Sequence, residues 1–423
     1  MTNQRPEIRT PEGVVRGIES NGVATFHAIP YAAAPVADLR WRPPQAPASW
    51  DIHDGTRTGP VPPQLPSRLR AAMGDIHVPQ SEDCLHLTVW TPSADSTPKP
   101  VVIWLHGGAW QSGGGALPWY AGETLARLGD VVVVGVNYRL AALGWLYVPG
   151  ETANVGLLDQ EAAIAWVKQN IAAFGGDSRK ITLMGQSAGA GSIACMLTRG
   201  PICDRIILQS PSLGRGIRSA EQAHRITDAY LAALGVGDLD QARAMPLSAL
   251  LQAQAHPDVA KVVGEEGSSR AMFGPVADGS VLGADVEKRF QAAAELADVL
   301  VGYTAEEMRA FPGAPDGKAG LALGDAVFGV ESRAWAARAG AASRRAWLYE
   351  FDCAPSQDFG ACHCIELPFI FGTWEAFDRA SMLKGLPLAD AVRLTSELQA
   401  AWIQFIREGT APWPKAPHIH HFI

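Results

Sequence analysis

The chain has 423 residues, a formal net charge of −8 at pH 7, 47% hydrophobic and 18% charged residues, and 43 glycines and 30 prolines. This length allows one large α/β domain or two smaller ones, and the glycines and prolines predict many turns and substantial loops. Because the net charge is negative, electrostatic attraction gives no reason to expect nucleic acid or an anionic membrane as a partner. No apolar run approaches the length of a membrane span.

Taken in chain order, the residues up to about position 80 are rich in proline and loops, with short strand candidates at 14–18 and 25–29. Strand and helix patterns then alternate. Further strands are expected at 85–90, 101–105, 131–137, 181–184, 206–209, 299–301 and 347–351. An amphipathic helix is expected at 160–174 and a long helix at 389–407. This alternation predicts an α/β fold with a mainly parallel central sheet covered by helices on both faces.

No internal repeat or low-complexity linker divides the chain, so we expect a single domain over residues 1–423. The span from about 213 to 273 is mostly helical in pattern and interrupts the alternation of strands and helices. We interpret it, together with about 308–345, as helical insertions that form a pocket wall or lid.

The six cysteines are too sparse for a disulfide scaffold, and the first residues contain no apolar core of a secretory signal. We therefore expect a reduced, cytoplasmic protein. The run Cys362-His363-Cys364 suggests a metal site at first sight. A single C-x-C with one histidine and no second cluster is a weak signal for zinc, and we expect neither a metal nor an organic cofactor.

The most informative segment is Gly185-Gln186-Ser187-Ala188-Gly189, which follows the strand-like residues 181–184 and precedes a helix-compatible run of small residues. This is the G-x-S-x-G pattern of a nucleophile elbow, in which a sharp turn between strand and helix projects a serine hydroxyl above the edge of a sheet. The two glycines permit the close approach of neighbouring backbone. The segment predicts Ser187 as the nucleophile of a serine hydrolase.

An activated serine needs a base, and in α/β-hydrolases the chain order is nucleophile, acid, histidine. Five histidines precede Ser187 and are excluded by that order: His27, His53, His77, His86 and His106. The remaining histidines are His224, His256, His363, His418, His420 and His421. Among them His363 alone lies in a loop after a late strand, where this fold carries its base.

For the acid, Glu306 and Glu307 follow the strand expected at 299–301. Adjacent side chains point in different directions, so only one of them can orient the histidine, and the pattern leaves both open. The oxyanion hole requires backbone N–H donors where negative charge develops. The run His106-Gly107-Gly108-Ala109 follows the strand at 101–105 and supplies such a loop, and the Ala188 amide adds another donor.

Several further motifs occur in the order that one family shows. They are Ser81-Glu82-Asp83-Cys84-Leu85, His106-Gly107-Gly108-Ala109-Trp110, Asn137-Tyr138-Arg139-Leu140, Asn154-Val155-Gly156-Leu157-Leu158-Asp159-Gln160 and Phe174-Gly175-Gly176-Asp177, followed by the elbow. The chain thereby resembles the type-B carboxylesterase family, which includes cholinesterases and bacterial para-nitrobenzyl esterases. The match is dense from about residue 13 to 210 and resumes at 274–279, 301–307 and 360–372.

The resemblance implies the α/β-hydrolase fold, with Ser187 as nucleophile, Glu307 as acid and His363 as base. It also implies Gly108, Ala109 and Ala188 as oxyanion donors. Three further residues are implied in supporting roles: Gly107 shapes the oxyanion loop, Gln186 lies beside the nucleophile, and Ser210 lies near the triad. Asp278 matches a structural motif and is expected to be a turn residue without a catalytic role.

The chain departs from the family pattern at several places. Met308 stands where the family usually has glycine, and the spacing from Glu307 to His363 is shorter than usual, which implies a reduced helical superstructure. Cys84 has no upstream cysteine with which to form the family's disulfide. The loop 65–80 contains no aromatic residue where cholinesterases carry a tryptophan, and Gln186 replaces their glutamate. These differences argue against choline esters as substrates.

The expected function is hydrolysis of a small-molecule carboxylic ester through an acyl-enzyme, with Trp110 and Trp119 as candidate walls of the substrate pocket. Two alternatives remain open. A biosynthetic acyltransferase, lactonase or cyclase would use the same triad with an acceptor other than water, and a non-catalytic binding protein would use only the fold. No oligomeric state is predicted.

Overall fold

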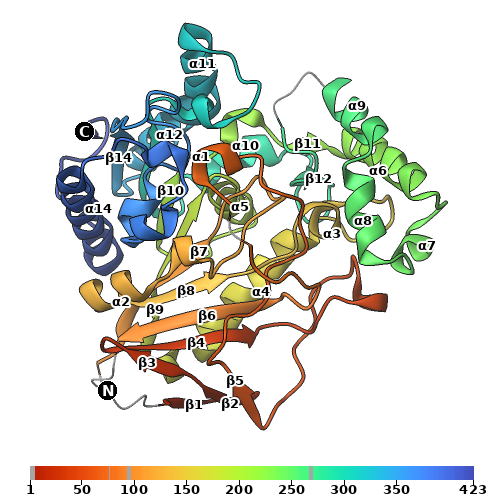
Figure 1. Ribbon diagram of the computed structural model, residues 1–423, viewed down its shortest axis with the longest axis horizontal. Helices are drawn as coiled ribbons and strands as arrows, with labels where there is room; N and C mark the ends of the chain where they lie inside the picture. Colours follow the sequence, from red (N-terminus) through yellow and green to blue (C-terminus); the bar gives the residue numbers. More distant parts are fainter. Residues whose placement is uncertain (1–4, 76, 93–96, 266–269) are drawn as a thin grey trace.

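A computed structural model describes residues 5–75, 77–92, 97–265 and 270–423 (Figure 1). Its centre is a ten-stranded sheet in the order β15-β14-β13-β10-β9-β7-β8-β6-β4-β3. The strands are β3 (Ile18–Ser20), β4 (Val23–Pro30), β6 (His86–Pro92), β7 (Lys99–Leu105), β8 (Val132–Val136), β9 (Gly176–Gln186), β10 (Arg205–Gln209), β13 (Asp298–Thr304), β14 (Ala346–Phe351) and β15 (Ile419–Phe422). Every neighbouring pair from β8 to β15 is parallel, whereas β3, β4 and β6 pair in antiparallel fashion.

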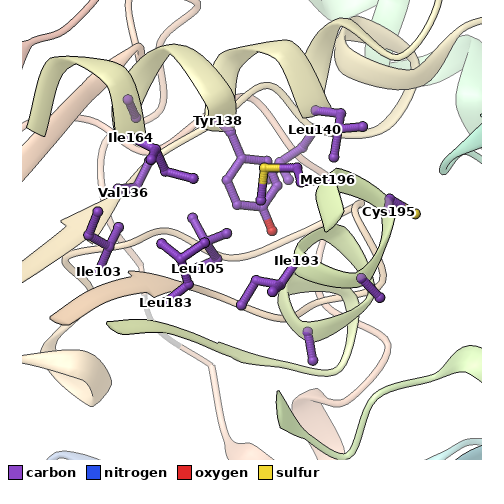
Figure 2. Packing of buried hydrophobic residues seen from close by; sticks show 14 of the residues in the cluster. Ile103, Leu105, Val136, Tyr138, Leu140, Ile164, Leu183, Ile193, Cys195 and Met196 are labelled. Carbon is purple, nitrogen blue, oxygen red and sulfur yellow. The ribbon is translucent and has the colours of Figure 1, made fainter. Parts of the chain in front are cut away.

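Alternate residues of the buried strands pack on opposite faces of this sheet, because successive side chains of a strand point to opposite sides. On one face Ile103 and Leu105 of β7 belong to the apolar cluster that includes residues of α4 (Val155–Asn170) and α5 (Ala188–Leu197) (Figure 2). On the other face Val102 and Trp104 pack in the cluster that includes residues of α2 (Glu123–Gly129), α13 (Leu367–Phe371) and α14 (Leu388–Glu408). The mainly parallel sheet covered by helices on both faces is thus confirmed.

The remaining elements lie around this sheet. A three-stranded sheet contains β1 (Glu7–Thr10), β2 (Gly13–Arg16) and β5 (Ile52–Asp54), and β11 (Arg218–Ser219) pairs with β12 (Val276–Ala277). The other helices are α1 (Arg70–Met73), α3 (Ala141–Trp145), α6 (Ala220–Leu234), α7 (Leu239–Arg243), α8 (Leu247–Gln254), α9 (Pro257–Glu265), α10 (Val286–Ala293), α11 (Gly317–Gly324) and α12 (Val330–Ala341). Helices α6 to α9 form a group at one end of the molecule, within the helical span expected after residue 213 (Figure 1).

Two expected elements are wrong in detail. The strand expected at 14–18 is divided at Gly17 between β2 and β3, which belong to different sheets. A Cβ at Gly17 would lie 2.6 Å from the carbonyl oxygen of Thr25, so a glycine is needed where the chain crosses over β4. The helix expected at 160–174 begins at Val155 and is not amphipathic in the usual sense, because polar residues on it are buried.

One of those buried polar residues explains the departure. Asp159 of α4 accepts two hydrogen bonds from the guanidinium of Arg139, at 2.7 and 2.6 Å, and both side chains are almost fully buried. Because Arg139 neutralises the Asp159 carboxylate inside the protein, this polar residue of α4 does not have to face water. Among the described helices, none is both long and apolar enough to cross a lipid bilayer.

The parallel strands set the position of the site. Strands β7, β9, β10, β13 and β14 all point the same way in the sheet, so the loops that follow them meet along one edge. Those loops begin after Leu105, Gln186, Gln209, Thr304 and Phe351. In an open α/β sheet, ligands bind at the carboxyl ends of the parallel strands.

Candidate active site

Ser187 stands alone between the last residue of β9 and the first residue of α5. Its φ and ψ are 52° and −114°, a conformation that a residue with a side chain rarely adopts, and it is therefore locally strained. The flanking glycines are required sterically. A Cβ at Gly189 would lie 1.9 Å from the Leu105 carbonyl oxygen, and one at Gly185 would lie 2.6 Å from the Gly189 carbonyl carbon. The sequence pattern thus corresponds to a tight strand-turn-helix junction.

The two adjacent glutamates point to different partners. Glu307, in the short 3-10 helix η5 (Glu307–Ala310), accepts the amide of Thr304 at 2.9 Å on Oε1, and its Oε2 accepts the Nδ1 proton of His363. Glu306 instead accepts the amide of Ala361 at 2.9 Å and pairs with Arg309 at 2.8 Å. Glu306 therefore holds the loop in which the histidine lies, whereas Glu307 contacts the imidazole.

Met308 fits at the position where a glycine was expected. It lies in η5 with an ordinary negative φ, and its side chain is buried. No positive φ or close backbone approach requires glycine there. The substitution is therefore compatible with the contact between Glu307 and His363.

The ring of His363 is fixed on several sides. Its Nε2 accepts a hydrogen bond from the side-chain amide of Gln186 at 3.1 Å, while Nδ1 donates to Glu307. The rings of Phe311 and Phe328 lie 5.1 and 4.8 Å from it, centroid to centroid. Phe328 belongs to η6 (Asp325–Gly329), a turn of π-helix between α11 and α12. The imidazole is 1% exposed and carries its proton on the nitrogen that faces the carboxylate.

A cavity of about 30 Å³ brings these groups together, since Ser187, His363, Gly108, Ala109 and Phe311 all line it. The loop after β7 supplies two of these residues with unusual backbone angles. Gly108 has a φ of 110° and Ala109 a φ of 56°. In the described part of the chain, the backbone amides of Gly108, Ala109 and Ala188 donate no hydrogen bond to another group. They are thus available to a substrate oxygen.

His106, excluded above as the base, supports this loop. Its Nδ1 contacts the carbonyl oxygen of Gly107 at 2.7 Å, and its ring stacks on Tyr138 with centroids 4.4 Å apart. Burial lowers the pKa of His106 to about 4, so the ring stays neutral near pH 7. Gly107 itself packs against the turn that contains Ser187, where an added Cβ would lie 2.3 Å from Gln186 Oε1 and 3.3 Å from Ser187 Cβ.

The other sequence-predicted residues lie around this centre. Trp110 lines a cavity of about 30 Å³ beside α5 and donates from Nε1 to Ser192 at 2.9 Å. Trp119 lines a separate pocket of about 400 Å³ that also reaches Gly107, Gly108 and Gln186, and it stacks on Phe377. The two tryptophans therefore belong to different pockets.

Two more predicted residues lie in supporting positions, Ser210 buried and Asp278 half-buried. Ser210 follows β10 with a φ of 43°, and its backbone amide donates to Gly302 at 2.8 Å. Asp278 accepts the amides of Val281 and Leu282 at 3.0 and 2.8 Å, which is the behaviour expected of a turn residue.

One buried carboxylic acid was not singled out from the sequence. Glu366 accepts a hydrogen bond from Gln209 at 3.2 Å and is fully buried. Burial and the nearby charge of Glu307 raise the pKa of Glu366 to about 8, so it is largely protonated at neutral pH. The signal in the sequence was weak, because a single glutamate before an apolar helix has no pattern of its own.

The cysteines do not form a ligand set. All six fall within the described ranges and are free, and burial raises the pKa of the thiols of Cys362 and Cys364. Among the described residues, the group that could hold a metal ion is Glu350, Asp352 and His421, at the pair of strands β14 and β15. Acidic groups of this kind are common without a metal, and none of the three residues lines the cavity of Ser187.

The family model, curated relatives and solved structures that match this chain all point to the same family. Residues 4–317 match the family model described as the carboxylesterase family. The chain is 37% identical to a probable N-octanoylanthranilate hydrolase of Rhodococcus erythropolis, over 97% of this chain and 94% of the relative. It is 34% identical to the para-nitrobenzyl esterase of Bacillus subtilis, over 95% and 90% of the two chains. A solved structure of a thermophilic para-nitrobenzyl esterase covers 98% of this chain with a TM-score of 0.86 and 30% identity, and 93% of that structure is covered in turn.

Proposed function

Because the chain belongs to the carboxylesterase family and is a carboxylic-ester hydrolase, we propose that Ser187, His363 and Glu307 form its catalytic triad. The proposal rests above all on one observation. The strained serine of the elbow shares a cavity with an imidazole whose Nδ1 donates to a buried carboxylate. That arrangement puts the lone pair on Nε2, which is the tautomer that a general base needs. Nε2 takes the Ser187 proton once the hydrogen bond from Gln186 gives way.

In the first step the oxygen of Ser187 attacks the ester carbonyl carbon while His363 Nε2 takes the hydroxyl proton. Glu307 stabilises the imidazolium that forms, and the two hydrogen bonds it accepts keep its carboxylate in place. The carbon–oxygen bond to the alcohol then breaks, and the imidazolium returns the proton to the departing alcohol. The product of this step is an acyl-enzyme on Ser187.

The carbonyl oxygen becomes an oxyanion during the attack. The unengaged amides of Gly108, Ala109 and Ala188 supply donors for that charge, and Ala188 adds the positive end of the α5 dipole. Removing one such donor typically lowers kcat by about 10²–10³-fold. Water activated by His363 then attacks the acyl-enzyme, and the acid is released.

The pocket of about 400 Å³ next to the oxyanion loop has room for one part of a small-molecule ester. The relatives include enzymes named as hydrolases of different compounds, among them a phenmedipham hydrolase and a fumonisin B1 esterase. Hydrolysis is therefore favoured over transfer of the acyl group to another acceptor.

The test is hydrolysis of p-nitrophenyl acetate, butyrate and octanoate by the wild type and by Ser187→Ala. A matched control is Ser178→Ala, which changes an exposed serine of β9 far along the strand from the turn. We expect activity to disappear in Ser187→Ala and to persist in Ser178→Ala. Turnover that survives in a folded Ser187→Ala variant would overturn the proposal. Added alcohol acceptors that divert the acyl group from water would favour the transferase alternative.

A further inference from the structure

Arg215 lies beside the proposed catalytic centre and ends the short 3-10 helix η4 (Leu213–Arg215) that follows β10. Its guanidinium carbon lies 5.3 Å from the ring centroid of Phe311 and 5.7 Å from that of Phe328. These are the two rings that contact His363, and Phe311 also lines the cavity of Ser187. One layer of aromatic side chains therefore separates this charge from the imidazole.

The charge of Arg215 is not neutralised by the protein. Within the described residues, its guanidinium makes no hydrogen bond or ion pair to a carboxylate. Glu307 acts on it electrostatically, but both oxygens of that carboxylate are engaged by Thr304 and His363. Glu287, which approaches the neighbouring Gly216, accepts the amide of Ile217. Cation–π contacts stabilise the guanidinium and leave its charge and N–H donors available.

A second arginine approaches from another part of the chain. Arg68 lines the same cavity as Ser187 and Phe311, and it is exposed. It also has no ion pair among the described residues. Burial, with the positive charge of Arg68, lowers the pKa of Arg215 to about 10, so Arg215 is charged at neutral pH.

Two unpaired positive charges that repel each other are unfavourable unless an anion lies near them. Arginine is also the side chain best suited to hold a carboxylate through two parallel hydrogen bonds. A partly buried guanidinium without a counter-ion lowers the stability of the folded protein. Apolar packing alone therefore does not explain an arginine at this position.

We propose that Arg215, assisted by Arg68, binds a carboxylate carried by the substrate, so that the enzyme prefers anionic esters. This inference rests on the proposed role of Ser187, because Arg68 lines the cavity of Ser187 and the Arg215 guanidinium lies over the ring of Phe311 in the wall of that cavity. Arg215 itself lines the neighbouring cavity beside α5. It adds a specificity-determining pair of residues to the triad and the oxyanion hole. The chemistry of recognition is the same whether the carboxylate is on the acyl group or on the alcohol.

The experiment compares two esters that differ by one methyl group and one charge. They are p-nitrophenyl hydrogen adipate, with a free carboxylate on its acyl chain, and p-nitrophenyl methyl adipate. We expect the wild type to favour the anionic ester in kcat/KM. In Arg215→Met the ratio of anionic to neutral kcat/KM should fall by about 10-fold or more, mainly through KM, because a charge-assisted hydrogen bond is lost.

Further variants separate charge from structure. Arg215→Lys should keep part of the preference, and Arg68→Gln should lower it by a smaller factor. Arg179→Gln, which changes an exposed side chain paired with Asp177, should leave the preference unchanged. Arg68→Gln and Arg215→Lys also test the inference if Arg215→Met fails to fold. The pair 4-acetoxybenzoate and methyl 4-acetoxybenzoate carries the charge on the alcohol side, so the pair with the larger effect of Arg215 identifies the side.

The outcomes are distinguishable. If the variants leave the ratio at its wild-type value for both pairs of esters, the inference is wrong, although the triad stands. If the neutral esters are hydrolysed independently of Ser187, the proposed function fails first. A preference for the neutral ester in the wild type would also overturn the inference.

Discussion

Replacing Glu307 by glutamine tests the orientation of the base. In the structure Oε1 of Glu307 accepts the Thr304 amide and Oε2 accepts the proton of His363 Nδ1. A glutamine at this site has one acceptor and one donor. If its oxygen stays on the buried Thr304 amide, its NH₂ group faces Nδ1, which must then accept, and the proton moves to Nε2. An imidazole protonated on Nε2 cannot take the proton of Ser187.

The opposite orientation of the glutamine would restore the correct tautomer but leave the Thr304 amide without an acceptor. That loss costs about 1–3 kcal/mol, so the inactive tautomer is favoured by roughly one to two orders of magnitude. The loss of the negative charge beside the imidazolium adds to the effect. For Glu307→Gln we therefore expect kcat to fall by about 10³–10⁴-fold with little change in KM.

The assay is steady-state hydrolysis of p-nitrophenyl butyrate, with thermal unfolding recorded to show that each variant is folded. Glu306→Gln is the matched control, since Glu306 contacts Ala361 and Arg309 and not the imidazole. It should keep kcat within about threefold, because a partly exposed ion pair contributes little. The reasoning would be refuted if Glu306→Gln lost activity while Glu307→Gln retained it within tenfold.

Three further predictions follow from the same contacts. Gly189→Ala places a Cβ 1.9 Å from a backbone carbonyl oxygen of β7 and should lower the free energy of unfolding by about 2 kcal/mol or more. The Cβ of the control Gly264→Ala in α9 meets nothing within 4 Å, so this variant should not lower that free energy. Urea unfolding measures both variants. Gly107→Ala displaces Gln186 and should lower kcat by about 10²-fold with an unchanged melting temperature; an unchanged kcat would contradict that role. The pKa of Glu366 is raised from 4.5 to about 8, so the folded state keeps a proton on this side chain that the unfolded state releases above about pH 4.5. The contribution of the protonated Glu366 to stability is therefore present at low pH and is lost as pH rises to 8. Glu366→Gln should therefore lose less stability than the wild type between pH 5 and 8 in chemical denaturation, by up to about 5 kcal/mol, and an identical pH profile would contradict it.

Much of the fold could be predicted from the sequence because its core strands are continuous apolar runs. Residues 131–137 and 299–301 identify β8 and β13, and the G-x-S-x-G pattern identifies the junction of β9 and α5. The strand β15 was not predicted, since a short edge strand that contains two histidines has no apolar alternation. Its position depends on a neighbouring strand that local sequence does not reveal.

The site shows the same division. Ser187, His363 and the glycine-rich loop follow from local motifs, whereas the choice between Glu306 and Glu307 depends on which carboxylate the loop at 361–363 meets in space. Arg68 and Arg215 carry no motif at all. They come from segments about 150 positions apart, and only the fold brings Arg68 to the cavity of Ser187 and Arg215 onto the Phe311 ring in the wall of that cavity.

The proposed mechanism depends most on Ser187 as the nucleophile. The most direct measurement is mass spectrometry of the protein after incubation with diethyl p-nitrophenyl phosphate. This reagent transfers its diethylphosphoryl group to an activated serine with release of p-nitrophenol, and the resulting phosphoester hydrolyses slowly. We expect one phosphoryl group per chain, located on the peptide that contains Ser187, with loss of esterase activity in proportion to labelling. A label on another residue, or full inhibition without modification of Ser187, would contradict the account.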